Sequence, residues 1–380
     1  MIPPVVAAAL LILLPPTAAF VTPAARSMVS GCSRNSATST PSSSSSSLDD
    51  AVVASSDEYT IGILGDLHID PRKMDDYIIG RSHFLSIFDE AKSGEKQRGV
   101  ALISLGDLGE PKNCEHNPDN DSELFAGTTA CHELAAEYLA GFDGVPYEIV
   151  GGNHDLEGLH EFDTDEANLD MYLKAHRKGS PQFCREVARK TLLVGMGPTI
   201  FRNATYISHE VAIDREQISW FENLLRTHPA EDGWKIFVFT HAPCIGSGLR
   251  ILQENQVVDG CCWLNQNDDE LRTKFIKLVR QHRCIKAWFS GHFHLGQDYQ
   301  DSITLPTIDS VDDGPTFPSR GSCVFAQTSV MRSETSKDGR QQSRLMRGNQ
   351  DGFEICTVDH QKGGQVRVDA SITLREKTTS

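Results

Sequence analysis

Residues 285–294, Ile-Lys-Ala-Trp-Phe-Ser-Gly-His-Phe-His, join an apolar run to two histidines that stand two positions apart. Four blocks upstream have the same form, a short apolar run that ends at Asp, Asn or His: residues 61–68, 100–107, 147–155 and 236–243. A short apolar run bounded by Gly and polar residues is typical of a buried strand. Because strand ends meet at one edge of a sheet, we expect these polar side chains to converge.

The spacing within the blocks predicts where the side chains point. On an extended backbone, residues two apart face the same side, so Asp66 and His68 can address one cluster. The same holds for the histidine pair that ends residues 285–294. Asn153 and His154 are adjacent and must point differently. One of them can therefore hold a metal while the other faces a substrate.

The side chains at these strand ends are imidazole, carboxylate and amide groups, without a thiolate. This donor set favours zinc, iron or manganese over copper(I) or an iron–sulfur cluster. Two metal ions roughly 3.5 to 4 Å apart need a bridging anion, and the carboxylate of Asp107 suits that role. Such a pair acidifies water and neutralises phosphoryl oxygens, as hydrolysis of a phosphate ester requires. We therefore predict two divalent or mixed-valence transition-metal ions as cofactors.

The ordered blocks GDLH, GDLGE, GGNHD, THAP and GHFH resemble the calcineurin-like metallophosphoesterase superfamily over residues 60–296. The resemblance implies an α/β fold, a four-layer α/β/β/α sandwich of two mixed β-sheets flanked by helices. It also implies a metal-dependent enzyme that hydrolyses a phosphate mono- or diester with a metal-activated water. The domain is expected to span residues 58–376.

The same resemblance implies a role for each residue of the blocks. One metal would be bound by Asp66, His68, Asp107 and His294. The other would be bound by Asp107, Asn153, His241 and His292. His154 would contact the substrate phosphate and assist the leaving group, and Asp155 would orient His154. From the residues alone, Asp155 is equally well explained as the cap of a helix that begins near Leu156.

Other residues near the blocks leave alternatives open. Glu110 stands where purple acid phosphatases carry a tyrosine ligand, so an iron–tyrosinate centre is not expected. Arg250, in a Gly-containing loop after His241, has the planar fork that clamps a phosphate, although a surface arginine is the preferred interpretation. His209 has no partner at ligand spacing. A nuclease of the same fold and a non-catalytic protein-binding scaffold remain the alternative functions.

The apolar periodicity predicts alternating strands and helices. Strands are expected near residues 59–65, 100–105, 145–150, 191–196, 205–211, 234–240 and 285–290. Helices are expected near residues 74–92, 130–141, 166–177, 214–227 and 267–281. Late strands at 322–330, 352–358 and 365–374 would build the second sheet, with residues 331–351 as a mobile loop. Asp214 and Gln217 indicate a capping box at the start of one helix.

The first 48 residues contain no acidic residue and carry an apolar core from Val5 to Leu14. This core is too short to span a bilayer comfortably, and residues 17–19 offer a small-residue cleavage site. We therefore expect a signal peptide over residues 1–19, a transit peptide and Ser-rich linker over residues 20–57, and no stable membrane span after cleavage. Together they resemble the bipartite plastid presequence of algae with secondary plastids. A secreted or endomembrane-lumen protein is the alternative.

The net charge bears on which partners the protein can bind, and the cysteine content bears on its disulfides. The formal charge is -16, and the two arginines of residues 1–48 are the only charges that removal of this segment would take away. Such an acidic chain repels nucleic acid backbones, which disfavours a nuclease. A small phosphorylated substrate or a phosphoprotein is the expected partner, and the oligomeric state is left open. Cys114 and Cys131 are candidates for a disulfide, against free buried thiols.

Overall fold

The computed structural model describes residues 56–93, 98–109, 125–249, 260–306 and 323–374. Twelve strands are assigned within this part of the chain: β1 Tyr59–Leu64, β2 Gly99–Ser104, β3 Tyr147–Ile149, β4 Phe183–Ala188, β5 Thr191–Gly195, β6 Lys235–Phe239, β7 Ile285–Ser290, β8 Ile303–Thr304, β9 Val324–Gln327, β10 Gln342–Gly348, β11 Gly352–Asp359 and β12 Gln365–Thr373. The α-helices are α2 Met74–Ser93, α3 Thr129–Ala140, α4 Asp165–Ala175, α5 Arg215–Thr227 and α7 Lys274–Gln281. Short 3-10 turns cover Pro71–Lys73, Ala230–Asp232, Gln300–Ser302 and His360–Lys362.

The strands form two mixed six-stranded sheets. The first sheet has the order β12-β11-β10-β1-β2-β3, and the second has the order β4-β5-β6-β7-β9-β8. In the first sheet, β1, β2 and β3 are parallel, while β10, β11 and β12 run antiparallel to their neighbours. In the second sheet, β5, β6, β7 and β9 are parallel. The parallel halves are therefore the parts that present several strand ends at one edge.

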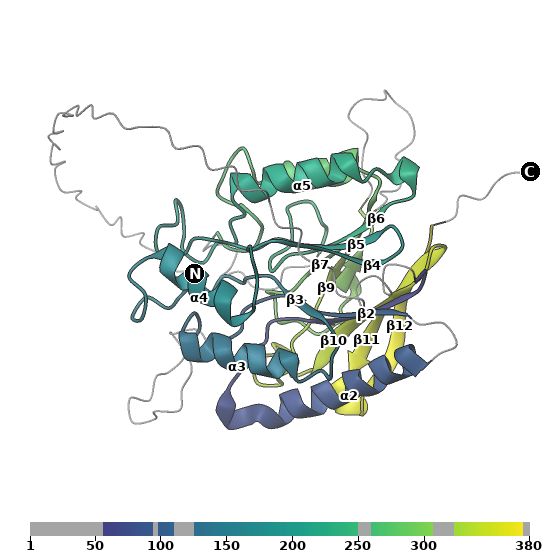
Figure 1. Ribbon diagram of the computed structural model, residues 1–380, viewed down its shortest axis with the longest axis horizontal. Helices are drawn as coiled ribbons and strands as arrows, with labels where there is room; N and C mark the ends of the chain where they lie inside the picture. Colours follow the sequence, from purple (N-terminus) through teal and green to yellow (C-terminus); the bar gives the residue numbers. More distant parts are fainter. Residues whose placement is uncertain (1–55, 94–97, 110–124, 250–259, 307–322, 375–380) are drawn as a thin grey trace, which may run out of the picture. The chain divides into compact units, whose positions relative to one another are not determined.

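Three apolar layers hold the sandwich together. Between the sheets, β1 residues such as Ile61 and Ile63 pack with Phe237 and Phe239 of β6. On the outer face of the first sheet, α2, α3 and α4 bury aromatic and aliphatic side chains against β1 and β2. On the outer face of the second sheet, α5 and α7 pack against β5, β6 and β7. Figure 1 shows α5 along one outer face and α2 and α3 along the other. The four-layer α/β/β/α sandwich is confirmed.

Local chemistry explains where the helices begin. α5 starts after Asp214, whose carboxylate accepts the backbone N–H of Gln217 at 2.8 Å. The predicted cap at Asp214 is confirmed, and the side chain of Gln217 donates to the Asp214 carboxylate, at 2.8 Å, in place of the backbone contact of a capping box. Thr128 and Thr164 cap α3 and α4 in the same way. These caps satisfy backbone donors that a helix start leaves without a partner.

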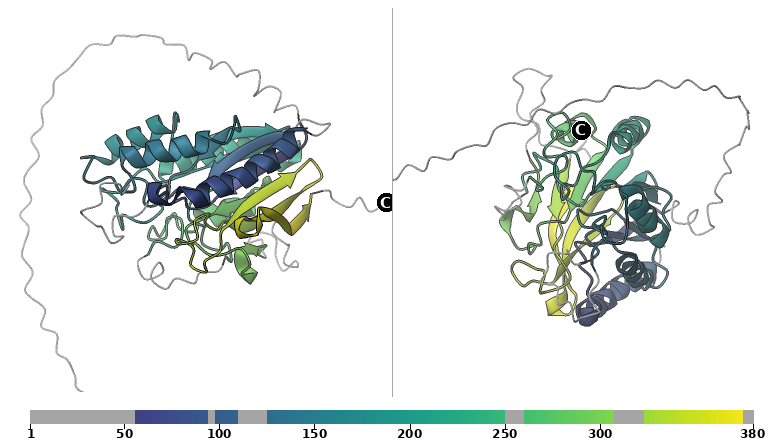
Figure 2. Two further views of the ribbon diagram at one scale, coloured as in Figure 1. Left: turned by 90° about the horizontal axis from the view of Figure 1, so that it is seen from below. Right: turned by 90° about the vertical axis from the view of Figure 1, so that its left-hand side faces the viewer.

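The late strands do not build the second sheet, contrary to the sequence prediction. Only β9 joins it, whereas β10, β11 and β12 extend the first sheet from the free edge of β1. Residues 331–351 are also not one mobile loop, because they contain β10. In the left view of Figure 2, these C-terminal yellow strands lie beside the purple helix α2. The prediction failed because the partner of β1 is nearly 300 residues away in the chain.

Three smaller predictions were also wrong. Residues 205–211 form bends and turns instead of a strand, and β4 supplies the edge strand of the second sheet in their place. The helix expected over residues 267–281 is limited to α7, Lys274–Gln281. No helix begins near Leu156, so Asp155 does not cap one. Within the described ranges, no helix is long and apolar enough to cross a membrane.

Candidate metal centre

All seven predicted metal-binding residues follow the ends of parallel strands. Asp66 and His68 follow β1, Asp107 follows β2, and Asn153 follows β3, all in the first sheet. The remaining three, His241, His292 and His294, follow β6 and β7 of the second sheet. The candidate centre is therefore built by both sheets at their common edge. Within the described residues, the side chains divide into two groups that share Asp107.

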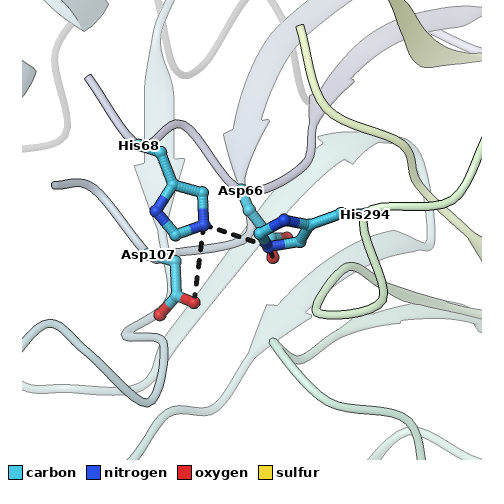
Figure 3. A group of neighbouring side chains, drawn as sticks. All are labelled: Asp66, His68, Asp107 and His294. Atoms are coloured by element: carbon cyan, nitrogen blue, oxygen red, sulfur yellow. Dashed lines mark hydrogen bonds and ion pairs between the residues drawn. The ribbon is translucent and has the colours of Figure 1, made fainter. Parts of the chain in front are cut away.

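The first group contains Asp66, His68, Asp107 and His294, which Figure 3 shows converging. The Nε2 atom of His294 lies 2.7 Å from Oδ2 of Asp66 and 3.0 Å from Nε2 of His68. Nε2 of His68 lies 3.9 Å from Oδ2 of Asp107. Two imidazole nitrogens and two carboxylates thus face one point, as a metal ion requires of its ligands.

The second group contains Asp107, His241 and His292, with Asn153 beside them. Nε2 of His241 lies 3.2 Å from Oδ2 of Asp107 and 2.9 Å from Oδ1 of Asn153. Nδ1 of His292 lies 3.1 Å from Nε2 of His241. The two groups are the ligand sets that the resemblance implied, and Asp107 stands between them.

The second ring nitrogen of each histidine contacts a backbone carbonyl. Nδ1 of His68 lies within hydrogen-bonding distance of the Gly109 carbonyl. Nδ1 of His241 contacts the Leu105 carbonyl and Nδ1 of His294 contacts the Thr335 carbonyl in the same way, and the three distances are 2.7 to 3.1 Å. His292 is reversed, because its Nε2 is 2.8 Å from the Cys261 carbonyl and its Nδ1 faces the centre. Such carbonyl contacts fix the tautomer and the ring orientation of metal-binding histidines. The four rings are thereby held ready to bind a metal ion.

The backbone at the site departs from the extended conformation that the spacing argument assumed. His68, Asp107, His292 and His294 all have positive φ, between 43° and 74°. This left-handed region is unfavourable for residues other than glycine and is found most often at functional sites. Asp66 and His68 do share a group, and His292 and His294 do not. The left-handed turns, and not the two-residue strand period, therefore decide which side chains meet.

Two glycines let the ligand loops approach one another. A Cβ atom on Gly152 would lie 2.1 Å from Oδ1 of Asp107, and one on Gly291 would lie 2.2 Å from Oδ1 of Asp66. No real Cβ makes such contacts with a fixed carboxylate. The glycines before Asn153 and His292 are therefore needed for space.

The charges of the centre fit the binding of cations. Burial alone would raise the pKa of the Asp107 carboxyl, but His241 and His154 hold that pKa well below its usual range. The pKa of Asp66 is lowered in the same way by His294 and His241. Burial opposes protonation of His241, yet the carboxylates of Asp107 and Asp66 raise its pKa to about 10. Two buried carboxylates thus demand nearby positive charge, and metal ions would replace the histidine proton that supplies it.

His154 is held by Glu157 and not by Asp155. Nδ1 of His154 lies 2.7 Å from Oε2 of Glu157, while its backbone N–H donates to Oδ1 of Asp107 at 3.0 Å. Burial alone would raise the pKa of Glu157, but the contact with His154 outweighs it and lowers this pKa to about 2. The carboxylate of Glu157 is therefore ionised. Asp155 instead accepts the backbone N–H groups of Asp107, Leu108 and Gly152, at 2.7 to 3.0 Å. Asp155 is therefore a residue that shapes the metal-binding loops.

Sequence reasoning missed Glu157 and His209. Oε1 of Glu157 lies 3.8 Å from Nε2 of His209, and the rings of His154 and His209 are 4.9 Å apart between centroids. No block of the sequence contains either residue.

Glu110, Arg250 and Cys114 lie outside the described residues. Cys131 is buried, and its pairing with Cys114 stays a prediction.

A model of the calcineurin-like phosphoesterase family matches residues 59–296, which is more than half of the chain. The protein therefore belongs to the calcineurin-like phosphoesterase family. A comparison with curated protein sequences finds no match.

Three solved structures are similar to this chain at low sequence identity. A dimetal phosphatase from Danio rerio has a TM-score of 0.53 and 10% identity, covering 83% of this chain and 99% of its own. GAP50, described as the anchor in the inner membrane complex of Plasmodium, has a TM-score of 0.46 and 12% identity, over 85% and 90% of the two chains. Vacuolar Protein Sorting 29 from Cryptosporidium parvum has a TM-score of 0.33 and 10% identity, over 83% and 98%. At these identities the likeness to the Danio rerio protein shows the fold alone.

Proposed function

We propose that this protein hydrolyses a phosphate mono- or diester by means of two transition-metal ions, manganese, iron or zinc. The observation that carries the proposal is the position of Asp107, whose buried carboxylate belongs to both groups of metal-binding residues. When bound, a metal pair supplies an acidified water and neutralises the charge of the phosphoryl oxygens. The seven ligands implied by the family resemblance are all present and close together, which supports an enzyme over a scaffold.

The residues of the chain suit the remaining parts of such a reaction. His154 is part-buried beside Asp107, and its Nδ1 is tied to Glu157. Burial opposes the charged imidazole, while Asp107 and Glu157 raise the pKa of His154. A charged imidazole with one nitrogen anchored can use the other to stabilise a phosphoryl oxygen or to give a proton to the leaving group. His154 is therefore assigned to contact the substrate and not to bind the two metal ions of the centre.

The test compares an aryl phosphate with a bis-aryl phosphate after removal of all metals. We expect no turnover by the metal-free protein and recovery when manganese, iron or zinc is added back. The ratio of the two rates then distinguishes a phosphatase from a phosphodiesterase. Failure to hydrolyse either substrate with any of the three metals would favour the non-catalytic scaffold. Cleavage of single-stranded DNA or RNA alone would favour the nuclease.

We also propose that residues 1–57 carry the protein to a plastid through the secretory pathway. The apolar core of residues 5–14, the small residues before Phe20 and the Ser-rich stretch that follows support this address. A fusion of residues 1–55 to a fluorescent protein should enter the plastid, and Phe20→Ala should divert it. Secretion of the unmodified fusion would contradict the proposal and favour the secreted alternative.

A further inference from the structure

Beside the metal centre, His154, Glu157 and His209 form a third cluster that uses none of the seven ligands. One ligand atom of each residue lies within 4.8 Å of the other two. The individual contacts are 2.7 Å from Nδ1 of His154 to Oε2 of Glu157 and 3.8 Å from Nε2 of His209 to Oε1 of Glu157. His154 and Glu157 share one turn, whereas His209 comes from the segment before α5. The fold therefore brings two imidazoles and a carboxylate together from separate parts of the chain.

This cluster resembles the two groups of the metal centre in its contacts. In the centre, too, the facing donor atoms lie close together, with 2.7 Å between His294 and Asp66 and 3.2 Å between His241 and Asp107. The third cluster differs in its exposure to solvent. The side chain of His209 is 36% exposed, whereas in the centre those of His241 and His294 are 0% and 16% exposed. An ion could therefore reach the third cluster directly from solution.

We propose that His154, Glu157 and His209 bind a third, exchangeable transition-metal ion of the zinc type, and that this ion inhibits the enzyme. Two imidazole nitrogens and one carboxylate oxygen, with a position left open, are a ligand set that zinc accepts. Binding is weaker than in the centre, because three residues hold this ion, against four for each ion of the centre. The site therefore fills after the other two.

The inhibitory effect rests on the proposed function. An ion on Nδ1 of His154 takes the place of the proton that Glu157 holds there. The imidazole can then release its other proton only by becoming an anion, which makes it a poor acid for a leaving group. An open coordination position of the ion would also compete for phosphate oxygens. Zinc should therefore activate at low concentration and inhibit at higher concentration.

The experiment is a zinc titration of the metal-free protein, with bound zinc measured by equilibrium dialysis and activity measured in parallel. We expect two tightly bound ions that raise activity and a third, weaker ion that lowers it. His209→Phe keeps a ring against Phe201 and His154 but removes one ligand. It should retain activity at two equivalents and weaken the third ion by at least about tenfold. Glu157→Gln should weaken the third ion as well.

His282→Gln is the matched control, because His282 is a part-buried histidine at the end of α7 that belongs to no described group of metal-binding residues. It should bind the third ion as the wild type does. A wild type that saturates at two ions would overturn the proposal, as would a third ion that persists in both His209→Phe and Glu157→Gln. If no substrate is hydrolysed, the proposed function fails, while the dialysis measurement still decides the third site.

Discussion

At the scale of single residues, the carboxylate of Asp107 belongs to both groups of candidate ligands and is proposed to bind two cations at once. Asp107→Asn removes its charge with little change of shape, so both metal ions should weaken together. Metal analysis after gentle purification should find two ions in the wild type and fewer than one in the variant. Asp75→Asn, at an exposed position in α2, is the control and should retain both ions. Full retention of one ion by Asp107→Asn would show that Asp107 does not bridge.

His154 is expected to act on the substrate and not to bind the two metal ions of the centre. His154→Gln should retain both ions of the centre and lose turnover by roughly 10² to 10⁴-fold, the usual worth of general acid assistance. The loss should be greatest for alkyl leaving groups and least for nitrophenol, which departs without a proton. Metal content and rates with both substrate types check this. Equal losses for the two leaving groups would instead mean that His154 only binds phosphate.

The sequence predicted the seven side chains that converge at the sheet edge, because each follows a strand end within a recognisable block. It did not identify Glu157 as the partner of His154, since the contact depends on a turn that no residue pattern announces. It also did not indicate that the carbonyls of Gly109 and Cys261 orient the rings of His68 and His292, because every residue type has a backbone carbonyl. The pairing of His68 with His294 required left-handed backbone conformations. Such conformations are determined by the packed loops, not by the local residue type.

At the scale of elements, α3 and α4 bury two histidines against each other. His132 and His176 pack with Tyr172, at 5.2 to 5.9 Å between ring centroids. Burial lowers the pKa of His132 to about 4 and that of His176 to about 3. Both pKa values lie below that of the unfolded chain, so stability is full above about pH 6.5 and falls as the pH drops toward these values.

His176→Phe tests this dependence, because it keeps the aromatic contact and removes the titrating group. In the wild type, His176 alone should lower the free energy of unfolding at pH 5 by about 2 kcal/mol relative to its value at neutral pH. The free energy of unfolding of the variant should therefore fall less steeply between pH 7 and pH 5 than that of the wild type. His160→Phe, at an exposed histidine, should leave the slope unchanged. An identical slope for the wild type and His176→Phe would refute the assignment.

The sequence predicted α5 well because its apolar residues recur with a strong helical period, and β1 because it is a short, fully buried run bounded by polar residues. β10 was missed because its sequence, QSRLMRG, appears too polar for a buried strand. In the structure, the guanidinium of Arg344 is fully buried, 2.5 Å from Asp369 and 2.8 Å from the carbonyl of Gln327. Its partner Asp369 lies in β12. A charge that is neutralised across the sheet cannot be recognised from one strand alone.

At the scale of the whole molecule, the metal centre joins the two sheets. An ion that binds only the folded protein stabilises it by roughly 3 kcal/mol at a hundredfold excess over its dissociation constant. Removal of both ions by a chelator should therefore lower the midpoint of thermal unfolding, and added manganese should restore it. Circular dichroism melting curves measure this. The chelator should have little effect on Asp107→Asn, and an unchanged midpoint for the wild type would contradict a centre shared by the sheets.

Because β1 pairs with β10, the part of the chain that contains the metal-binding residues lacks a strand that its own sheet needs. A polypeptide that ends at residue 296 would contain all seven metal-binding residues and the whole family match. It would nevertheless lack β10, β11 and β12, so β1 would present an open edge of backbone donors and acceptors. Open strand edges are templates for aggregation. During synthesis, that edge stays uncovered until residues 342–348 have emerged, so we expect the nascent chain to be prone to aggregation up to that point.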